Sequence, residues 1–256
     1  MRILYLGDIV GENTIHILKE NLEAIKKEYH IHMVLCNAEN VTKGKGLSYS
    51  HYKELKALGI AGMTMGNHTF SKSEIKDYIS SATIARPANL STTYGKDVLY
   101  IHYNQEVIAL VNLLGRVYMN TPLDCPFKVF EELLPKIQAD KIIVDFHGEA
   151  TSEKKAFFYC FAGKVDAILG THTHIKTDDR EVYENTCYIS DLGMCGPKYS
   201  VLGSDVAGII ERFKTGIYEP VKVSEGMEYE LNGVILDLGK VNKIEDFKKN
   251  IKAPLL

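Results

Sequence analysis

The sequence lacks several features that would assign it to a specialised class of protein. Its cysteines are odd in number and include no Cys-x-x-Cys pair, so neither a disulfide framework nor a zinc ribbon is indicated. We expect reduced thiols at Cys36, Cys125, Cys160, Cys187 and Cys195. No stretch approaches the roughly 18 apolar residues of a membrane-spanning helix, and the amino terminus MRILYLGDIV is typical of a first strand and not of a signal peptide. A cytoplasmic protein without a membrane-embedded part is therefore expected.

Strong net charge and biased composition are also absent. A net charge of −3 gives no bulk electrostatic reason to expect duplex nucleic acid as a partner, although a local basic patch could hold a nucleotide phosphate. Hydrophobic residues at 45% and charged residues at 25% are ordinary values for a globular protein, which excludes a disordered or collagenous chain.

Linkers and repeats are missing as well. The sequence has no segment rich in proline or serine and no internal repeat, and its only biased stretch is the lysine-rich tail after Gly239. We therefore predict one domain over residues 1–256. Because tyrosine-rich surfaces suit an interface as well as a cleft, the 15 tyrosines in a chain without tryptophan are compatible with a homo-oligomer, which is our expectation.

Apolar runs alternate with segments of helical periodicity over much of the chain, which is typical of parallel α/β units. Strands are predicted at 3–6, 33–36, 62–65, 141–146 and 165–169. Helices are predicted around Ile15–Ile25, around Leu55–Leu58, at 71–79 with Ser71 as N-cap and Glu74 in capping-box position, and at 152–162. A hairpin over 98–114 and antiparallel segments at 182–192 and 221–238 interrupt this rhythm. The prediction is a mixed sheet or two packed sheets.

Five of the apolar runs each end in a possible metal ligand. The ligands are Asp8 after ILYLG, Glu39 after VLCNA, Asn67 after MTMG, His147 after IIVDF, and His172 with His174 after AILGT. In open α/β folds the carboxyl ends of parallel strands meet at one edge of the sheet, so these groups would converge although they are far apart in the sequence. This layout indicates a metal-centred active site.

Each of these residues also has a structural interpretation. Asp8 could cap a helix or close a turn, and Glu39 could be a solvated loop carboxylate. The G-N-H-T segment at 66–69 could be a simple turn, and His147 could be a buried histidine with satisfied hydrogen bonds. The G-T-H-T-H segment is harder to dismiss, because imidazoles at i and i+2 can reach two neighbouring metals or two faces of one.

The remaining candidates are less clear. Glu149 is either part of the site or an acidic residue in the first turn of the next helix, where it would suit the helix dipole. The other histidines sit in helical or strand contexts without a ligand-like partner nearby, and we expect them to be structural or exposed: His16, His30, His32, His51 and His102.

The ligand types indicate the chemistry. Carboxylates, amides and imidazoles without thiolates suit manganese or iron as well as zinc, and the candidates are too numerous for one ion, so two metals are implied. Two-metal hydrolytic sites hold a hydroxide between the ions and clamp both oxygens of an in-line displacement, which makes phosphate esters the natural substrates. His68, next to Asn67, could stay outside the metal shell and act as general acid.

Longer motifs contain these residues. They are MRILYLGDIVG at the start, NAEN at 37–40, MGNHT at 65–69, RPAN from Arg86, DFHGEATSEK from Asp145, GTHTH at 170–174 and DLGMCGP from Asp191. On these motifs, which span nearly the whole chain, the sequence resembles the calcineurin-like metallophosphoesterase superfamily and, within it, the YmdB-like group of 2′,3′-cyclic-nucleotide phosphodiesterases.

The resemblance implies an α/β fold, a four-layer α/β/β/α sandwich with two packed mixed sheets. It also implies two divalent or mixed-valence metal ions per chain. One would be held by Asp8, Glu39, Asn40 and His174, and the other by Glu39, Asn67, His147 and His172, with Glu39 as the bridge. His68 carries over as the catalytic acid. The implied reaction is in-line attack of a hydroxide bridging the metals on a 2′,3′-cyclic nucleotide, a small-molecule phosphodiester, with release of a 3′-nucleotide.

Some positions depart from the wider superfamily. Val10 stands where the superfamily has the histidine of its D-x-H motif, and Glu39 replaces the more common bridging aspartate; both departures are shared by the YmdB-like group. They leave the metal open, with iron or manganese favoured over zinc or magnesium. Gly148 and Lys176 differ from the group's H-A-E and T-H-T-H-x-Q patterns at the rim of the site.

Two other functions remain alternatives at this point. One is a phosphomonoesterase or nucleotidase of broader specificity that uses the same metals. The other is a regulatory protein that binds cyclic phosphates or RNA with little turnover. A structural metal site fits poorly, because such sites are normally closed by four Cys or His ligands. The sequence does not locate the residues that bind the substrate.

Overall fold

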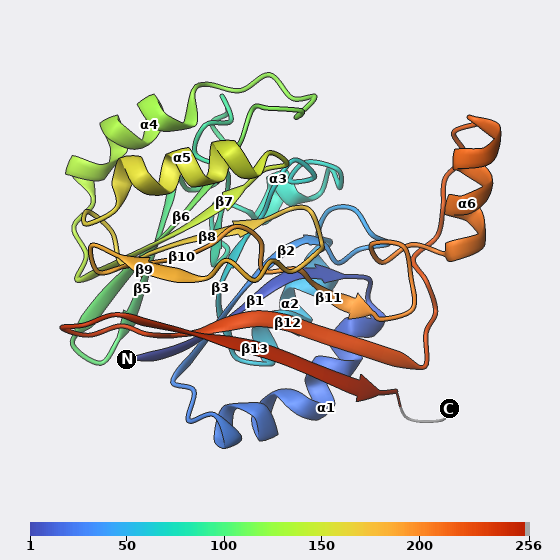
Figure 1. Ribbon diagram of the computed structural model, residues 1–256, viewed down its shortest axis with the longest axis horizontal. Helices are drawn as coiled ribbons and strands as arrows, with labels where there is room; N and C mark the ends of the chain where they lie inside the picture. Colours follow the sequence, from blue (N-terminus) through green and yellow to red (C-terminus); the bar gives the residue numbers. More distant parts are fainter. Residues whose placement is uncertain (254–256) are drawn as a thin grey trace.

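Two β-sheets packed face to face, with helices on their outer sides, form the body of the protein (Figure 1). The computed structural model describes residues 1–253. The helices are α1 (Asn13–Glu28), α2 (Tyr49–Ala57), α3 (Ile75–Tyr78), α4 (Pro126–Leu133), the 3-10 helix η1 (Leu134–Lys136), α5 (Thr151–Phe161) and α6 (Val206–Thr215). The strands are β1 (Arg2–Val10), β2 (Met33–Asn40), β3 (Ile60–Thr64), β4 (Ile84–Ala85), β5 (Val98–Tyr103), β6 (Glu106–Leu114), β7 (Lys141–His147), β8 (Ala167–Thr171), β9 (Glu181–Tyr183), β10 (Thr186–Ile189), β11 (Met194–Pro197), β12 (Glu228–Asp237) and β13 (Lys243–Lys252).

Both sheets are mixed. Within residues 1–253 the larger sheet has the strand order β13-β12-β11-β1-β2-β3-β4 and the smaller one the order β5-β6-β7-β8-β10-β9. In the larger sheet β1 to β4 run parallel, whereas β12 pairs antiparallel with β1, β11 and β13. In the smaller sheet β6, β7 and β8 run parallel, and β5 pairs antiparallel with β6 in the predicted hairpin.

Three hydrophobic clusters hold these layers together. Because side chains alternate along a strand, Tyr5 of β1 points into the cluster between the sheets, where it joins Leu110, while Leu4 joins Leu18 of α1 on the outer side. The third cluster contains Phe157 of α5 and lies on the outer side of the smaller sheet. The structure therefore confirms the four-layer α/β/β/α arrangement of two packed mixed sheets.

The parallel strands of the two sheets place their carboxyl ends at the same edge of the sandwich. Asp8 of β1 lies opposite Asn37 of β2 in the larger sheet, and His147 of β7 lies opposite Thr171 of β8 in the smaller one. Figure 1 shows α6 standing beyond this edge, apart from the layers. The predicted ligands thus gather at one end of the molecule, as the α/β rule requires.

Two of the predicted strands were too short. The strands predicted at 3–6 and 33–36 continue to Val10 and Asn40, because the polar residues near their ends are buried within the strands and do not terminate them. The segment 182–192 does contain the antiparallel pair β9–β10, but β10 also runs parallel to β8. The strand at 221–238 is antiparallel as predicted and occupies Glu228–Asp237.

The helix predicted at 71–79 is wrong over its first half. Only Ile75–Tyr78 is helical, and no side chain caps its start. The preceding residues form tight turns instead, in which Thr69 N donates to Gly66 O (3.1 Å) and Ser71 N donates to His68 O (3.0 Å). Ser71 is therefore a turn residue beside His68 and not an N-cap.

Six elements had no counterpart in the prediction. They are α4, η1, α6, β4, β11 and β13, the last of which forms from the lysine-rich tail. β13 is an edge strand with charged residues between the buried or half-buried Ile244, Phe247 and Ile251, and such charges protect a sheet edge from further pairing.

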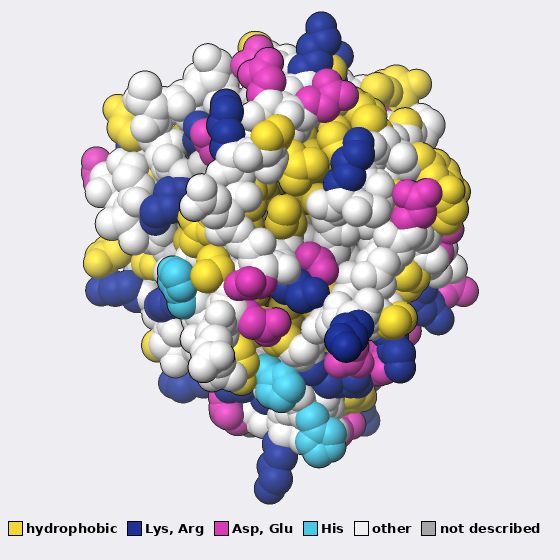
Figure 2. Space-filling view, turned by 90° about the vertical axis from the view of Figure 1, so that its left-hand side faces the viewer, with side chains coloured by type: hydrophobic (Ala, Val, Ile, Leu, Met, Phe, Trp, Pro, Cys, Tyr) yellow, Lys and Arg dark blue, Asp and Glu magenta, His cyan; other side chains and the backbone are white. Residues whose placement is uncertain are grey.

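The surface away from the strand ends is mixed in charge. Figure 2 shows the end of the molecule opposite α6, where basic and acidic side chains are interspersed without a large patch of one sign. None of the helices within residues 1–253 combines the length and the apolar character that crossing a bilayer would require.

Candidate metal centre

Four of the predicted ligands meet at the carboxyl ends of β2, β3, β7 and β8. His147 Nε2 lies 3.0 Å from Glu39 Oε1, 3.1 Å from Asn67 Oδ1 and 3.1 Å from His172 Nδ1. Glu39, His147 and His172 form the group of His, Cys, Asp and Glu side chains in the described chain whose ligand atoms lie within 4.8 Å of one another. Oxygen and nitrogen donors at this spacing suit a divalent transition metal.

The other three predicted ligands adjoin this group on the side of β1. His174 Nε2 lies 3.9 Å from Asp8 Oδ1 and 3.1 Å from the amide nitrogen of Asn40, which in turn lies 3.3 Å from Glu39 Oε1. Glu39 therefore stands between the two groups. Ligation by Asn40 would use its oxygen, which requires a half-turn of the amide.

Asp8 supplies a direct test of whether the site suits a cation. The side chain is fully buried, and its Oδ1 has no hydrogen-bond partner within residues 1–253. A buried carboxylate oxygen without a partner is costly, and a metal ion would satisfy it. The residues present therefore fit a bound metal.

Each of the three histidines has one ring nitrogen held by a neighbouring group. Thr171 Oγ1 donates to Asp145 Oδ1 (2.5 Å), so at 2.9 Å it can only accept from His147 Nδ1. His174 Nδ1 donates to the carbonyl of Leu202 at 2.9 Å. His172 Nε2 lies 3.2 Å from Glu149 Oε2. These contacts leave His147 Nε2, His172 Nδ1 and His174 Nε2 free to ligate, which is how outer groups orient metal-binding imidazoles.

Asp145 supports the ligands of the centre through hydrogen bonds. It is fully buried and also accepts a hydrogen bond from the Thr64 hydroxyl and one from Asn37 Nδ2 at 3.2 Å. Burial raises the pKa of Asp145, whereas His147 and the hydroxyl donors act against that rise. The carboxylate thus fixes Thr171 and, through it, the ring of His147.

The loop that carries His172 and His174 is strained. Their φ values are 107° and 64°, in a region that residues with a side chain rarely adopt. Asp191 holds the loop in place by accepting from Thr173 N at 3.0 Å, and the fully buried Lys154 pairs with Asp191 at 2.9 Å. A buried ion pair therefore holds a strained ligand loop.

Gly66 allows the first group of ligands to approach one another. A Cβ atom at this position would collide with Glu39 Oε2 and His147 Nε2 and would lie 2.6 Å from His147 Cδ2. Only glycine leaves the required space, because every other residue carries a Cβ.

The charges of the centre are strongly coupled. Burial alone would raise the pKa of Glu39, but the adjacent His147 lowers it to about 2. Burial would likewise lower the pKa of His147, but Glu39 outweighs it and raises that pKa to about 9. Burial raises the pKa of Asp8 to about 6, and burial next to His147 lowers that of His172 to about 3. Without a metal, the proton on His147 thus supplies the positive charge that Glu39 requires, and a ligating metal would displace it.

His68 lies at the surface of the centre. Its backbone N donates to Glu39 Oε2 at 2.8 Å, while its half-buried imidazole lies 3.5 Å from Ser71 Oγ and lines the adjoining cleft. Burial lowers the pKa of His68, although Glu39 acts in the opposite direction. A lower pKa makes the imidazolium a stronger acid.

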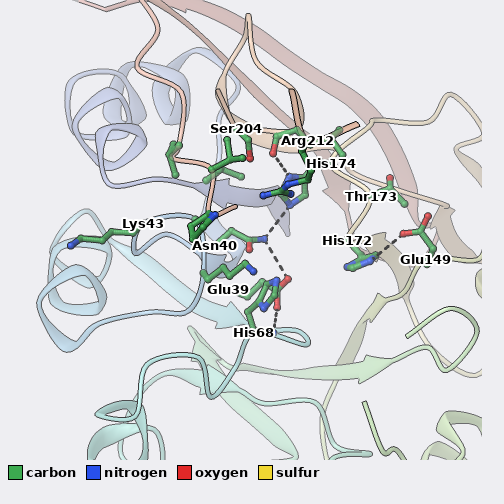
Figure 3. Close-up of a pocket in the computed structure, with 18 of the residues that line it drawn as sticks. Glu39, Asn40, Lys43, His68, Glu149, His172, Thr173, His174, Ser204 and Arg212 are labelled. Atoms are coloured by element: carbon green, nitrogen blue, oxygen red, sulfur yellow. Dashed lines mark hydrogen bonds and ion pairs between the residues drawn. The ribbon is translucent and has the colours of Figure 1, made fainter. Parts of the chain in front are cut away.

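A cleft of about 600 Å³ opens above these residues (Figure 3). Its floor contains Glu39, Asn40, His68, His172 and His174, and its walls come from the loop after β2 and from residues 202–223, here called the C-terminal arm. Lys45 lines it and forms no ion pair with any residue between 1 and 253, whereas the side chain of Lys43 extends away from the ligands (Figure 3). The cleft is therefore suited to an anionic ligand.

Two positions at which the sequence departs from the patterns of related proteins, Val10 and Lys176, lie on different sides of the site. Val10 lines the cleft, whereas Lys176 turns away to the sheet, where its Nζ donates to Gly233 O (2.6 Å) and Phe247 O (2.7 Å). Glu149, left open in the sequence, precedes α5 and contacts His172.

All eight predicted site residues are brought together by the fold, but the prediction missed the groups that hold them: Asn37, Thr64, Gly66, Asp145, Lys154, Thr171 and Asp191. A usable signal existed for two of these residues. Asp145 interrupts the apolar run IIVDF, and Lys154 takes a core-facing position of a helix. Such buried polar positions are informative by themselves.

Comparisons with known proteins agree with this fold. The family model described as YmdB-like protein matches residues 4–249. A 2′,3′-cyclic-nucleotide 2′-phosphodiesterase of Bacillus subtilis (strain 168) is 41% identical over 248 residues, which cover 95% of this chain and 93% of the relative. A novel phosphatase from Mycoplasma pneumoniae has a TM-score of 0.93 at 39% identity, covering 99% of this chain and 95% of that one, and a hypothetical protein from Thermus thermophilus has 0.92 at 32%, covering 98% and 99%. The resemblance inferred from the motifs is thereby confirmed, and the chain belongs to the YmdB-like protein family.

Proposed function

We propose that this protein is a metal-dependent phosphodiesterase that hydrolyses 2′,3′-cyclic nucleotides to 3′-nucleotides. The observation that carries the proposal is the set of oxygen and nitrogen ligands next to a cleft lined by Lys45, together with the buried Asp8 Oδ1, which has no hydrogen-bond partner within residues 1–253. The Bacillus relative named for this activity supports the choice of substrate.

The metallophosphoesterase fold of this family implies divalent metal ions, and we propose two per chain, with iron or manganese favoured. Asp8, Glu39, Asn40 and His174 would hold one, and Glu39, Asn67, His147 and His172 the other, with Glu39 shared. Bound there, the ions supply Lewis acidity toward a phosphoryl oxygen and a water nucleophile at neutral pH.

The remaining steps fall to side chains of the cleft. Lys45 attracts the phosphodiester anion, since its ammonium group forms no ion pair with any of residues 1–253. His68 gives its proton to the 2′-oxygen as the bond from phosphorus breaks, which leaves a 3′-phosphate and a 2′-hydroxyl. The lone pairs of His147 Nε2, His172 Nδ1 and His174 Nε2 stay directed at the ions because the opposite ring nitrogens are held.

The test is hydrolysis of 2′,3′-cyclic AMP by protein that has been stripped of metal and resupplied with manganese or ferrous iron. We expect 3′-AMP, identified by chromatography, only with metal present. The His68→Ala variant should keep its metal content and lose about 10²- to 10⁴-fold in kcat. No turnover with any metal, or equal activity of His68→Ala, would refute the proposal.

A phosphomonoesterase is the second candidate, favoured by the Mycoplasma pneumoniae structure that is described as a phosphatase. The two functions differ in substrate charge and not in the metal ligands. Measuring kcat/KM for 3′-AMP in parallel with 2′,3′-cyclic AMP decides between them, because a phosphodiesterase releases 3′-AMP and does not consume it.

A further inference from the structure

The C-terminal arm, residues 202–223, contributes little to the core. No side chain of α6 is buried, and Phe213 is 81% exposed. Since helices in proteins are stabilised mainly by packing of an apolar face, an arm without such packing is not explained by stability. Its inner side, however, lines the same cleft as the metal ligands.

Arg212 and Tyr218 form a fixed stack on this inner side. The guanidinium carbon of Arg212 lies 4.1 Å from the centroid of the Tyr218 ring, and Arg212 Nη2 donates to Glu219 O at 2.5 Å. Arg212 Nε is buried but has no hydrogen-bond partner within residues 1–253. The arm therefore presents a planar pair whose guanidinium is held against the Tyr218 ring.

Arg212 and Tyr218 lie where the base of a nucleotide would lie if its phosphate were bound at the floor of the cleft. The floor of the cleft holds Glu39, His68 and His174, and Arg212 lines the same cleft, drawn above Glu39 and His68 in Figure 3. The Leu202 carbonyl at the start of the arm accepts from His174 Nδ1, which ties the arm to the centre. With the phosphate on the floor, the ribose and base of a nucleotide extend toward the wall that the arm forms.

We propose that Arg212 and Tyr218 form a stacking platform for the nucleobase of the substrate, an inference that rests on the proposed function. One face of the Tyr218 ring is covered by the guanidinium, but the residue is 78% exposed and so retains a flat surface for a base. Because every base has a π-face, such a platform accepts all of them and favours purines through their larger area.

The test compares two substrates that differ only in the base. They are 2′,3′-cyclic AMP and the 2′,3′-cyclic phosphate of 1-O-methylribose, which has none. In Tyr218→Leu, KM for the nucleotide should rise about tenfold with kcat little changed, because stacking acts equally on bound substrate and transition state. The base-free substrate should be hydrolysed as by the wild type. Arg212→Met should behave similarly, whereas Tyr218→Phe should keep most of the affinity.

Phe213→Leu is the matched control, since it removes an exposed ring of the same arm that does not line the cleft. It should leave both substrates unaffected. Equal losses of Tyr218→Leu on both substrates, or no loss on either, would overturn the platform. If the wild type hydrolyses neither substrate, the proposed function fails. Calorimetric binding of 2′,3′-cyclic AMP then decides, and equal affinity of Tyr218→Leu and wild type would overturn the platform as well.

Discussion

The floor and the arm of the cleft are built in opposite ways. The floor rests on strand ends, where Asp8, Glu39 and His147 are at most 1% exposed and each contacts a group from another strand. The arm consists of one helix and its flanking loops, with Phe213 and Tyr218 largely exposed. The floor is part of the cooperative core, whereas the arm is attached to it at a few points such as the contact between His174 and Leu202.

This contrast separates two tasks. Metal ligands must be held within a fraction of an ångström, and rigid strands with supporting hydrogen bonds do this best. A surface that receives different bases needs less precision, so a lightly attached helix is sufficient. We therefore expect mutations in the floor to affect metal binding and stability, and those in the arm to affect substrate affinity alone.

The largest effect should come from Gly66→Ala. The added methyl group would collide with Glu39 and His147, so the first ligand group must separate. We expect loss of metal by elemental analysis and a fall in kcat/KM on the order of a hundredfold or more. Gly239→Ala is the control, because a Cβ there meets no described atom within 4 Å. Full metal content in Gly66→Ala would show that the floor is softer than its packing indicates.

Lys154→Met should mainly reduce stability. Lys154 and Asp191 form a buried ion pair at 2.9 Å, and removing the lysine leaves a buried carboxylate without its cation. Breaking such a pair costs about 3–5 kcal/mol in the free energy of unfolding, measured by urea denaturation. Lys155→Met on the same helix breaks a pair with Glu181 in which both side chains are about one-third exposed, so it should cost less than about 1 kcal/mol. Equal urea midpoints for the two variants would contradict the role of Lys154.

Asp145→Asn should weaken metal binding more than it weakens the fold. The amide cannot accept from Thr64, Thr171 and Asn37 as the carboxylate does, so the ring of His147 loses its fixed orientation. Loss of such a supporting group typically lowers metal affinity about 10- to 100-fold, which competition with a chelating dye would measure. Asp166→Asn, which disturbs a pair with Lys141 at the other end of the sheet, should leave the affinity unchanged. An equal fall in both variants would mean that general destabilisation is the cause.

The same contrast explains what the sequence revealed. The strand ends of the floor were predictable, because an apolar run that stops at a polar residue marks both the strand and the position of its ligand, as at Asp8 and His147. The resemblance to a family then added Asn40, whereas His68 had been proposed from its place next to Asn67. The supporting groups Thr171 and Lys154 were missed, since their role depends on contacts across strands and helices that no local pattern contains.

The arm was missed for a different reason. The α6 sequence VAGIIERFKT is apolar enough for a core helix, yet none of its side chains is buried. Its amphipathic pattern therefore does not predict that the helix lies outside the core. The helix predicted at 71–79 failed in a related way, because Ser71 and Glu74 fit a capping box while the chain there folds into turns that position Asn67 and His68. Local propensity is overridden where the site sets the backbone.

We expect the smallest effect from Asp205→Ala. This variant tests most directly whether the arm is attached separately from the floor. Asp205 caps α6 by accepting from Gly208 N at 2.9 Å, and losing a cap costs about 1 kcal/mol of helix stability. Because α6 is not packed into the core, hydrogen exchange of its amides should accelerate about fivefold while exchange in β1 and β7 and the urea midpoint stay unchanged. Ser48→Ala removes the corresponding cap of α2, whose Leu55 is fully buried, so there the urea midpoint should fall. A fall of the midpoint in Asp205→Ala as large as that in Ser48→Ala would mean that the arm unfolds together with the sandwich and is not a separately attached element.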